Sequence, residues 1–144
     1  MDDHTYNGVV AMLDGDHVTA ARELRLAAEG GDASAQHLLS HLFQDGQGGP
    51  QDHVKSAQWC RRAAERGLAH AQWRYGLLYL TGRGVPKDNV QAYAWFETAA
   101  AQDDTLINLQ DRLLCEMTPA ELREAQERSR EYFEMFVVPF REVE

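Results

Sequence analysis

The chain has 144 residues, a length that suits one domain able to bury roughly two thirds of its unfolded surface. Hydrophobic residues make up 44% and charged residues 26%, as in ordinary globular proteins, and no apolar run is long enough to cross a bilayer. We therefore expect no membrane insertion, and the net charge of −9, which opposes contact with phosphate backbones, leads us to expect no nucleic-acid partner. The acidic start of the chain lacks the basic and apolar regions of a secretory signal, and we expect a cytoplasmic location.

The N-terminal segment predicts a helical hairpin. Apolar residues at helical spacing indicate one helix over about 4–13 and a second over 17–29, joined by the short turn at 14–16. Glu23 stands where the later hairpins have tryptophan. We therefore treat 4–32 as a degenerate N-terminal hairpin, since the terminal unit of an array has one face in water.

The middle of the chain repeats itself with a period of 36 residues. Residues 33–68 match residues 69–104 at 12 of 36 positions. Each copy predicts an amphipathic helix (33–45 or 69–81), a turn rich in glycine and proline, and a second helix that Asp52 or Asp88 can cap. The second helices are expected to run to about Arg66 and Gln102. Several identical positions suit close helix packing: Ala63, Ala64, Ala99 and Ala100, together with the large pair Trp59 and Trp95.

The C-terminal part predicts a capping hairpin over 105–136, followed by a tail at 137–144. Its first helix is expected over 105–116. Thr118, Pro119 and Glu121 form a helix start signal with a capping box, and about 17 helical residues follow. The apolar face of this last helix is expected to pack on the 105–116 helix, and Pro139 is expected to end it.

A repeated unit of this size cannot bury its apolar face alone, so its copies stack. The sequence therefore predicts a single domain over 1–144 with an all-α fold: a right-handed α–α superhelical solenoid of about eight helices in four hairpins. Trp59 and Trp95 are expected to supply the large buried area between neighbouring hairpins.

Residues 69–100 carry the string A-x-A-Q-x-x-x-G-x-x-Y-x-x-G-x-G-V-P-x-D-x-x-x-A-x-x-W-x-x-x-A-A. This string resembles the Sel1-like repeat, a relative of the tetratricopeptide repeat with a longer turn inside the hairpin. The first copy departs from it at Ser40, which replaces Gly76, and at Gly49, which replaces Val85; the second copy has Asp103 in place of Gly67. The resemblance implies a bacterial adaptor or scaffold that grips a peptide or another protein's helix on a concave face lined by the first helix of each hairpin.

By that resemblance, the first helices present a largely apolar surface to a protein or peptide partner. Trp73 is the expected anchor, because its counterpart in the preceding copy is His37 and shared packing does not require an aromatic side chain there. The alternative is that the C-terminal helix or a second copy of the chain fills the groove, which leaves a homodimer or a self-assembling module open. The expected partner-binding residues are Met12, His37, His41, His70, Trp73, Leu77, Leu80 and Leu109.

A few residue types suggest chemistry, and we expect none of it to be used. His37 and His41 are four residues apart on one helical face, with His70 one repeat away, so a metal- or small-molecule-binding enzyme is the alternative hypothesis. No acidic residue stands between them as a general base. Cys60 replaces Phe96 of the next repeat and Cys115 adjoins two leucines, so both are read as inert, buried thiols. We expect a non-enzymatic protein without metal or cofactor.

Overall fold

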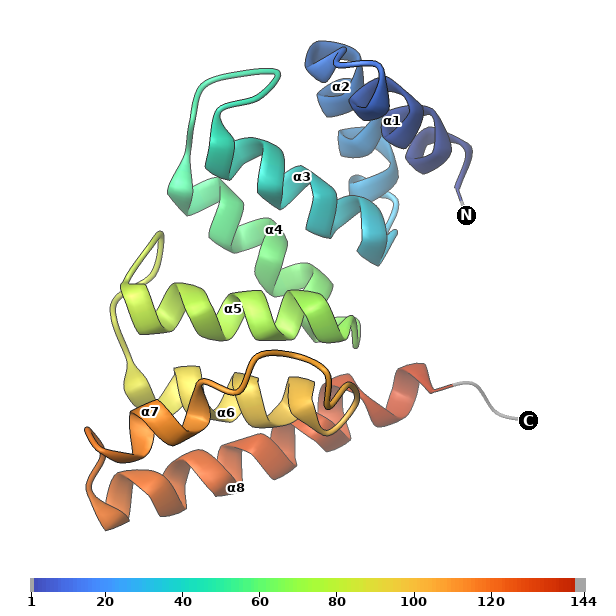
Figure 1. Cartoon of the computed structure of the whole chain (residues 1–144). Coiled ribbons are helices and arrows are strands. Elements are labelled where there is room, and N and C mark those ends of the chain that lie inside the picture. The colour runs from blue at the N-terminus through green and yellow to red at the C-terminus, as the bar shows by residue number, and fades with distance from the viewer. Residues whose placement is uncertain (1, 142–144) are drawn as a thin grey trace. The chain divides into compact units, whose positions relative to one another are not determined.

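The computed structural model describes residues 2–141, which form eight α-helices and a short 3-10 helix and contain no strand (Figure 1). The all-α class and the number of helices are therefore confirmed. Residues 142–144 of the expected tail lie outside the described range. The chain divides into two compact units at Ala63 and Ala64, inside the fourth helix.

The first unit contains α1 (Asp3–Leu13), α2 (His17–Glu29), α3 (Ala33–Asp45) and most of α4 (His53–Glu65). These bounds agree with the predicted helices to within a residue at each end. Helix α2 packs against both α1 and α3. The core of the unit consists of small and aliphatic side chains: Ala11, Ala20, Leu24, Ala27, Ala28, Ala35, Leu39 and Leu42. The half-buried Trp59 packs against this core.

Two polar contacts fasten α1 within this unit. The fully buried Thr5 hydroxyl donates to the Asp32 carboxylate at 2.8 Å, and the other carboxylate oxygen accepts the Ala35 N–H at 3.1 Å, which caps α3. Burial of Asp32 opposes its ionisation, but these hydrogen bonds outweigh burial and lower the pKa of Asp32. Glu23, at the position of the missing tryptophan, instead contacts the His4 ring at 2.5 Å.

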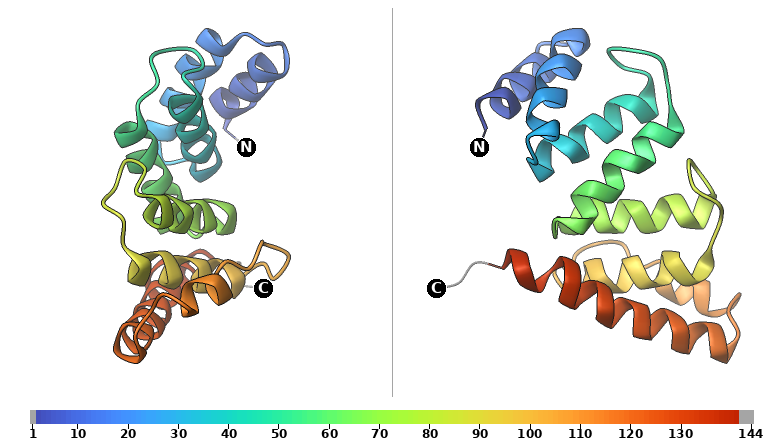
Figure 2. Two further views of the ribbon diagram at one scale, coloured as in Figure 1. Left: turned by 60° about the vertical axis from the view of Figure 1, so that its left-hand side comes forward. Right: turned by 180° about the vertical axis from the view of Figure 1, so that it is seen from behind.

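The second unit contains the end of α4, then α5 (Ala69–Thr81), α6 (Asn89–Ala100), α7 (Gln110–Leu114), α8 (Pro119–Phe136) and the 3-10 helix η1 (Val138–Phe140). Helix α6 lies between α5 and α8 and packs against both (Figure 2). The predicted helix over 105–116 is wrong in length, because only Gln110–Leu114 is helical. Thr105 donates its backbone N–H to the Asp103 carboxylate at 3.0 Å, a local bond typical of a turn.

An aromatic cluster holds α8 on α6. Trp95 is only 3% exposed, and its ring stacks on Tyr132 at 4.4 Å and on Phe136 at 5.7 Å between centroids. Tyr75 of α5 meets the same indole edge-on at 5.3 Å. The expectation that α8 would pack mainly on the 105–116 helix is therefore wrong: its aromatic side chains need a large flat partner, and Trp95 of α6 supplies it. The capping box of Thr118 and Glu121 is present as predicted.

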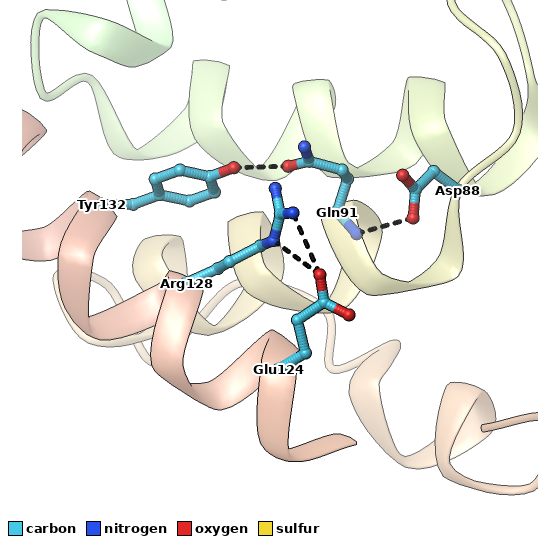
Figure 3. Close-up of polar contacts among 5 residues, drawn as sticks. All are labelled: Asp88, Gln91, Glu124, Arg128 and Tyr132. Atoms are coloured by element: carbon cyan, nitrogen blue, oxygen red, sulfur yellow. Dashed lines mark hydrogen bonds and ion pairs between the residues drawn. The ribbon is translucent and has the colours of Figure 1, made fainter. Parts of the chain in front are cut away.

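Polar contacts accompany this packing at the outer edge of the α6–α8 pair (Figure 3). The Tyr132 hydroxyl donates to the Gln91 side-chain oxygen at 2.5 Å, and the Gln91 backbone N–H donates to Asp88, which caps α6. Arg128 bonds Glu124 one turn earlier at 3.0 Å. The capping helix is thus joined to α6 by both ring stacking and hydrogen bonds.

The two repeats solve one packing problem in two ways. In the second repeat Phe96 is fully buried, and a Cβ added to Gly76 would lie 2.9 Å from its ring. In the first repeat the residues equivalent to Phe96 and Gly76 are Cys60 and Ser40. The thiol of Cys60 is smaller than the Phe96 ring and leaves room for the Ser40 hydroxyl. Ser40 donates to the Ser56 carbonyl at 2.7 Å and Ser56 donates back to the Ser40 carbonyl at 2.8 Å. The second repeat thus pairs the large Phe96 with glycine, and the first repeat pairs the smaller Cys60 with the larger serine.

Candidate interaction surface

The predicted partner-binding residues of the second unit come from α5 and from the turn that precedes α7. His70, near the start of α5, is exposed to solvent. Trp73, Leu77, Leu80 and Leu109 are half-buried, and all four pack against one cluster that includes Phe96 and Leu113. The structure thus places these four side chains against one cluster and turns much of their surface toward the unit's own core.

Trp73 has internal partners that sequence reasoning missed. Its indole N–H donates to the carbonyl oxygen of Ile107 at 2.9 Å, and its ring lies 6.2 Å from that of Phe96. The turn at 105–109 therefore contacts the edge of the α5 face. No sequence signal points to Ile107 as the acceptor, because a backbone carbonyl in an aperiodic turn carries no residue-specific pattern.

The predicted residues of the first unit lie on α1 and α3. Met12 is half-buried and packs against the first core. His37 and His41 are half-buried neighbours on α3, with their rings edge to face at a centroid distance of 4.7 Å. Their Nε2 atoms are 3.3 Å apart, which fits one neutral imidazole donating a hydrogen bond to the other.

Of the eight predicted partner-binding residues, five also pack on the core of their own unit, and only His70 is fully exposed. The aliphatic and aromatic members thus stabilise the fold, whatever else they contact. Their role in binding a partner stays a prediction.

The structure also places the residue types that suggest chemistry. Among residues 2–141, no group of three His, Cys, Asp or Glu side chains is placed to hold a metal ion. Cys60 is fully buried, as predicted, whereas the prediction for Cys115 is wrong: it lies just after the short α7 and is exposed. Within the described residues no helix is long and apolar enough to cross a membrane.

Comparisons with known proteins agree with the architecture. The Sel1 repeat family matches residues 33–68 and 69–104, the two copies of the 36-residue period. The protective antigen c5321 of uropathogenic Escherichia coli, described as having an SLR fold, is similar over 95% of this chain, with 32% identity and a TM-score of 0.86. A Sel1 repeat protein from Oxalobacter formigenes is similar over 71% of this chain, with 28% identity and a TM-score of 0.65.

This chain covers only 30% of the length of the first of these proteins and 45% of the second. The search of curated proteins found no match. The two matched repeats nevertheless make up half of the sequence, and the helical hairpins agree with both solved structures. The chain belongs to the Sel1 repeat family.

Proposed function

We propose that this protein is a non-enzymatic adaptor that binds a peptide or a partner helix through the first helices of its hairpins. Sel1 repeats generally serve as modules for protein–protein interaction. The expected surface of the first unit uses the exposed parts of α1 and α3, including His37 and His41, and that of the second unit uses the exposed part of α5, including His70.

One observation carries the proposal: the two repeats share the residues that pack and differ in the residues expected to face a partner. Ala35 and Ala71 are both fully buried, and Gln36 and Gln72 make the same bond, to the carbonyls of Ala28 and Ala64 at 3.1 and 3.0 Å. The facing positions instead pair Ser34 with His70, His37 with Trp73, and His41 with Leu77. Trp73 and Leu77 also pack on their own core, but Ser34 and His70 are exposed, so shared packing does not dictate the residue at their position and a partner's side chains are free to do so.

The test is a peptide selection followed by affinity measurement. A displayed library of random peptides would be selected on the immobilised full chain, and the enriched peptides measured by fluorescence polarisation. His70→Glu and Ser34→Glu change exposed first-helix positions without opening the core, so both should keep the circular dichroism spectrum. We expect at least one of them to weaken binding at least tenfold, about 1.4 kcal/mol.

Gln58→Glu is the matched control, since Gln58 is exposed on α4, a second helix. It introduces the same charge and should leave the affinity unchanged. Failure to enrich any saturable binder, or equal affinity of all three variants, would contradict the proposal. Sedimentation of the free chain across a range of concentrations tests the self-assembling alternative, which requires a dimer or larger species.

Zinc dialysis tests the histidine alternative. The adaptor proposal expects no stoichiometric metal after equilibrium dialysis and elemental analysis. One bound zinc that is lost in His37→Ala would favour the enzyme hypothesis instead.

A further inference from the structure

The first unit contains a cavity of about 290 Å³ between α2, α3 and the turn that joins α3 to α4. Its apolar wall consists of Ala21, Leu39, Leu42 and Phe43. Pockets for small molecules usually measure about 300–1,000 Å³, so this one is at the small end and suits one or two side chains better than a cofactor.

The turn beside the cavity is fixed by a close backbone contact. Gly46 ends α3 in the left-handed region, with φ at 67°, and the equivalent Gly82 ends α5 with φ at 71°. A Cβ added to Gly48 would collide with the carbonyl oxygen of His17, so the turn lies directly on the start of α2. The turn at the opening of the cavity is therefore held in place by the left-handed Gly46 and by the close contact of Gly48 with α2.

The cavity lies where the first repeat lacks a side chain that the second repeat has. Gly49 borders the cavity and stands at the position of Val85, which is half-buried. A Cβ added to Gly49 would meet no atom within 4 Å, and Gly49 does not have a positive φ. Since the second repeat carries Val85-Pro86 at the same place, a valine fits the backbone there. The first repeat thus leaves open a space that an aliphatic side chain can occupy.

The rim of the cavity carries positive charge on a chain whose net charge is −9. Arg25 of α2 and Lys55 of α4 both line it, and neither forms a salt bridge within residues 2–141. The Lys55 ammonium lies 5.7 Å from the centroid of the Phe43 ring. Asp52 also lines the cavity. Its carboxylate accepts a hydrogen bond from the backbone N–H of Lys55 at 3.0 Å and so caps α4. With Asp52 counted, two cations and one anion line the cavity, and the excess positive charge favours an occupant that is apolar and acidic together.

We propose that this cavity binds an acidic segment of a partner protein, which inserts one aliphatic side chain into the space left by Gly49 while its carboxylates meet Arg25 and Lys55. The site is separate from the first-helix surface proposed above. It rests on the adaptor function only in that the partner is a protein.

The probe is a fluorescein-labelled heptapeptide with a central leucine flanked by glutamates, titrated with the full-length chain by fluorescence polarisation. Two companion peptides replace the leucine by serine or the glutamates by lysine. We expect saturable binding of the first peptide, at least tenfold weaker binding of either companion, and weaker binding as salt concentration rises. In nitrogen–proton correlation spectra the amide signals of Gly48 and Gly49 should shift on titration.

Gly49→Val is the decisive variant, because it adds at the edge of the cavity the side chain that the second repeat already uses. It should keep the circular dichroism spectrum and the melting temperature while weakening the peptide at least tenfold. Arg25→Gln should weaken the peptide severalfold, whereas Arg22→Gln, a matched and exposed position on the same helix that does not line the cavity, should not.

Equal affinity of Gly49→Val and the unmodified chain would overturn the proposal, as would the absence of saturable binding up to millimolar peptide. Should Gly49→Val lose its fold, Arg25→Gln and the Gly49 amide signal still decide the question. Selected peptides that respond to His70→Glu would uphold the adaptor function even where the heptapeptide does not bind, so the two proposals fail separately.

Discussion

Trp95→Ala should be among the most destabilising single substitutions in the second unit. The indole is 3% exposed and touches three aromatic rings, two of them stacked from α8. Truncating a buried aromatic to alanine costs about 3–5 kcal/mol, and each aromatic pair contributes about 0.5–1.5 kcal/mol beyond its buried area. We therefore expect a loss of about 4–5 kcal/mol in the free energy of unfolding, measured by urea titration with far-UV circular dichroism.

Trp59→Ala is the matched control, because Trp59 occupies the same position of the other repeat. It is half-buried, and the Arg62 guanidinium covers its ring at 4.7 Å from the centroid. The loss there should be smaller, about 1–3 kcal/mol, since part of the indole already contacts water and a flexible cation. A loss below about 1 kcal/mol for Trp95→Ala, or equal losses for the two variants, would refute the conclusion that α8 packs mainly on Trp95.

Three further predictions concern other contacts. Gly76→Ser should cost about 1–3 kcal/mol in urea titration because its Cβ would press on Phe96, and adding Phe96→Cys should recover part of that loss by recreating the first repeat's pair. Asp32→Asn should keep part of the helix cap but lower stability near neutral pH, since a neutral amide replaces the carboxylate that Thr5 and Ala35 stabilise, and it should flatten the decline in acid. The lowered pKa of Asp32 means that its contribution is complete above the unfolded pKa and is lost as pH falls through the folded one, as acid titration of both chains would show. Removing residues 118–144 should expose Trp95 and yield aggregates or dimers in light scattering, whereas a stable monomer would make α8 an independent tail.

Local signals explain why most helices could be predicted from the sequence. The bounds of α3 and α5 follow from apolar periodicity and from Gly46 and Gly82. These two glycines adopt the left-handed conformation that ends each helix. Asp52 and Asp88 cap the second helices through bonds to residues three positions later. All of these interactions lie within one turn of the helix end, so both interacting residues fall in the same short stretch of sequence.

Long-range choices could not be predicted in the same way. The apolar residues of 105–109 suit a helix by periodicity, yet this segment forms turns, and Leu109 contacts the second core from outside a helix. The stacking of Tyr132 on Trp95 joins residues 37 positions apart, and periodicity shows only that α8 has an apolar face, not which helix covers it. The same periodicity predicts Cys115 in a buried helix, whereas the early end of α7 leaves it exposed.

Trp73 shows how a difference between repeats can have two causes. The absence of an aromatic counterpart at His37 indicates that common packing does not need Trp73, and the sequence therefore predicts a binding anchor. The structure adds a cause specific to the end of the array: the turn at 105–109 follows the second repeat, and Ile107 accepts the indole hydrogen bond. Gly49 is the converse case, because the first repeat there loses a side chain and no described residue of the first unit fills the space. A difference between repeats that leaves a space open is therefore a stronger reason to expect a partner than one that adds a side chain with contacts of its own.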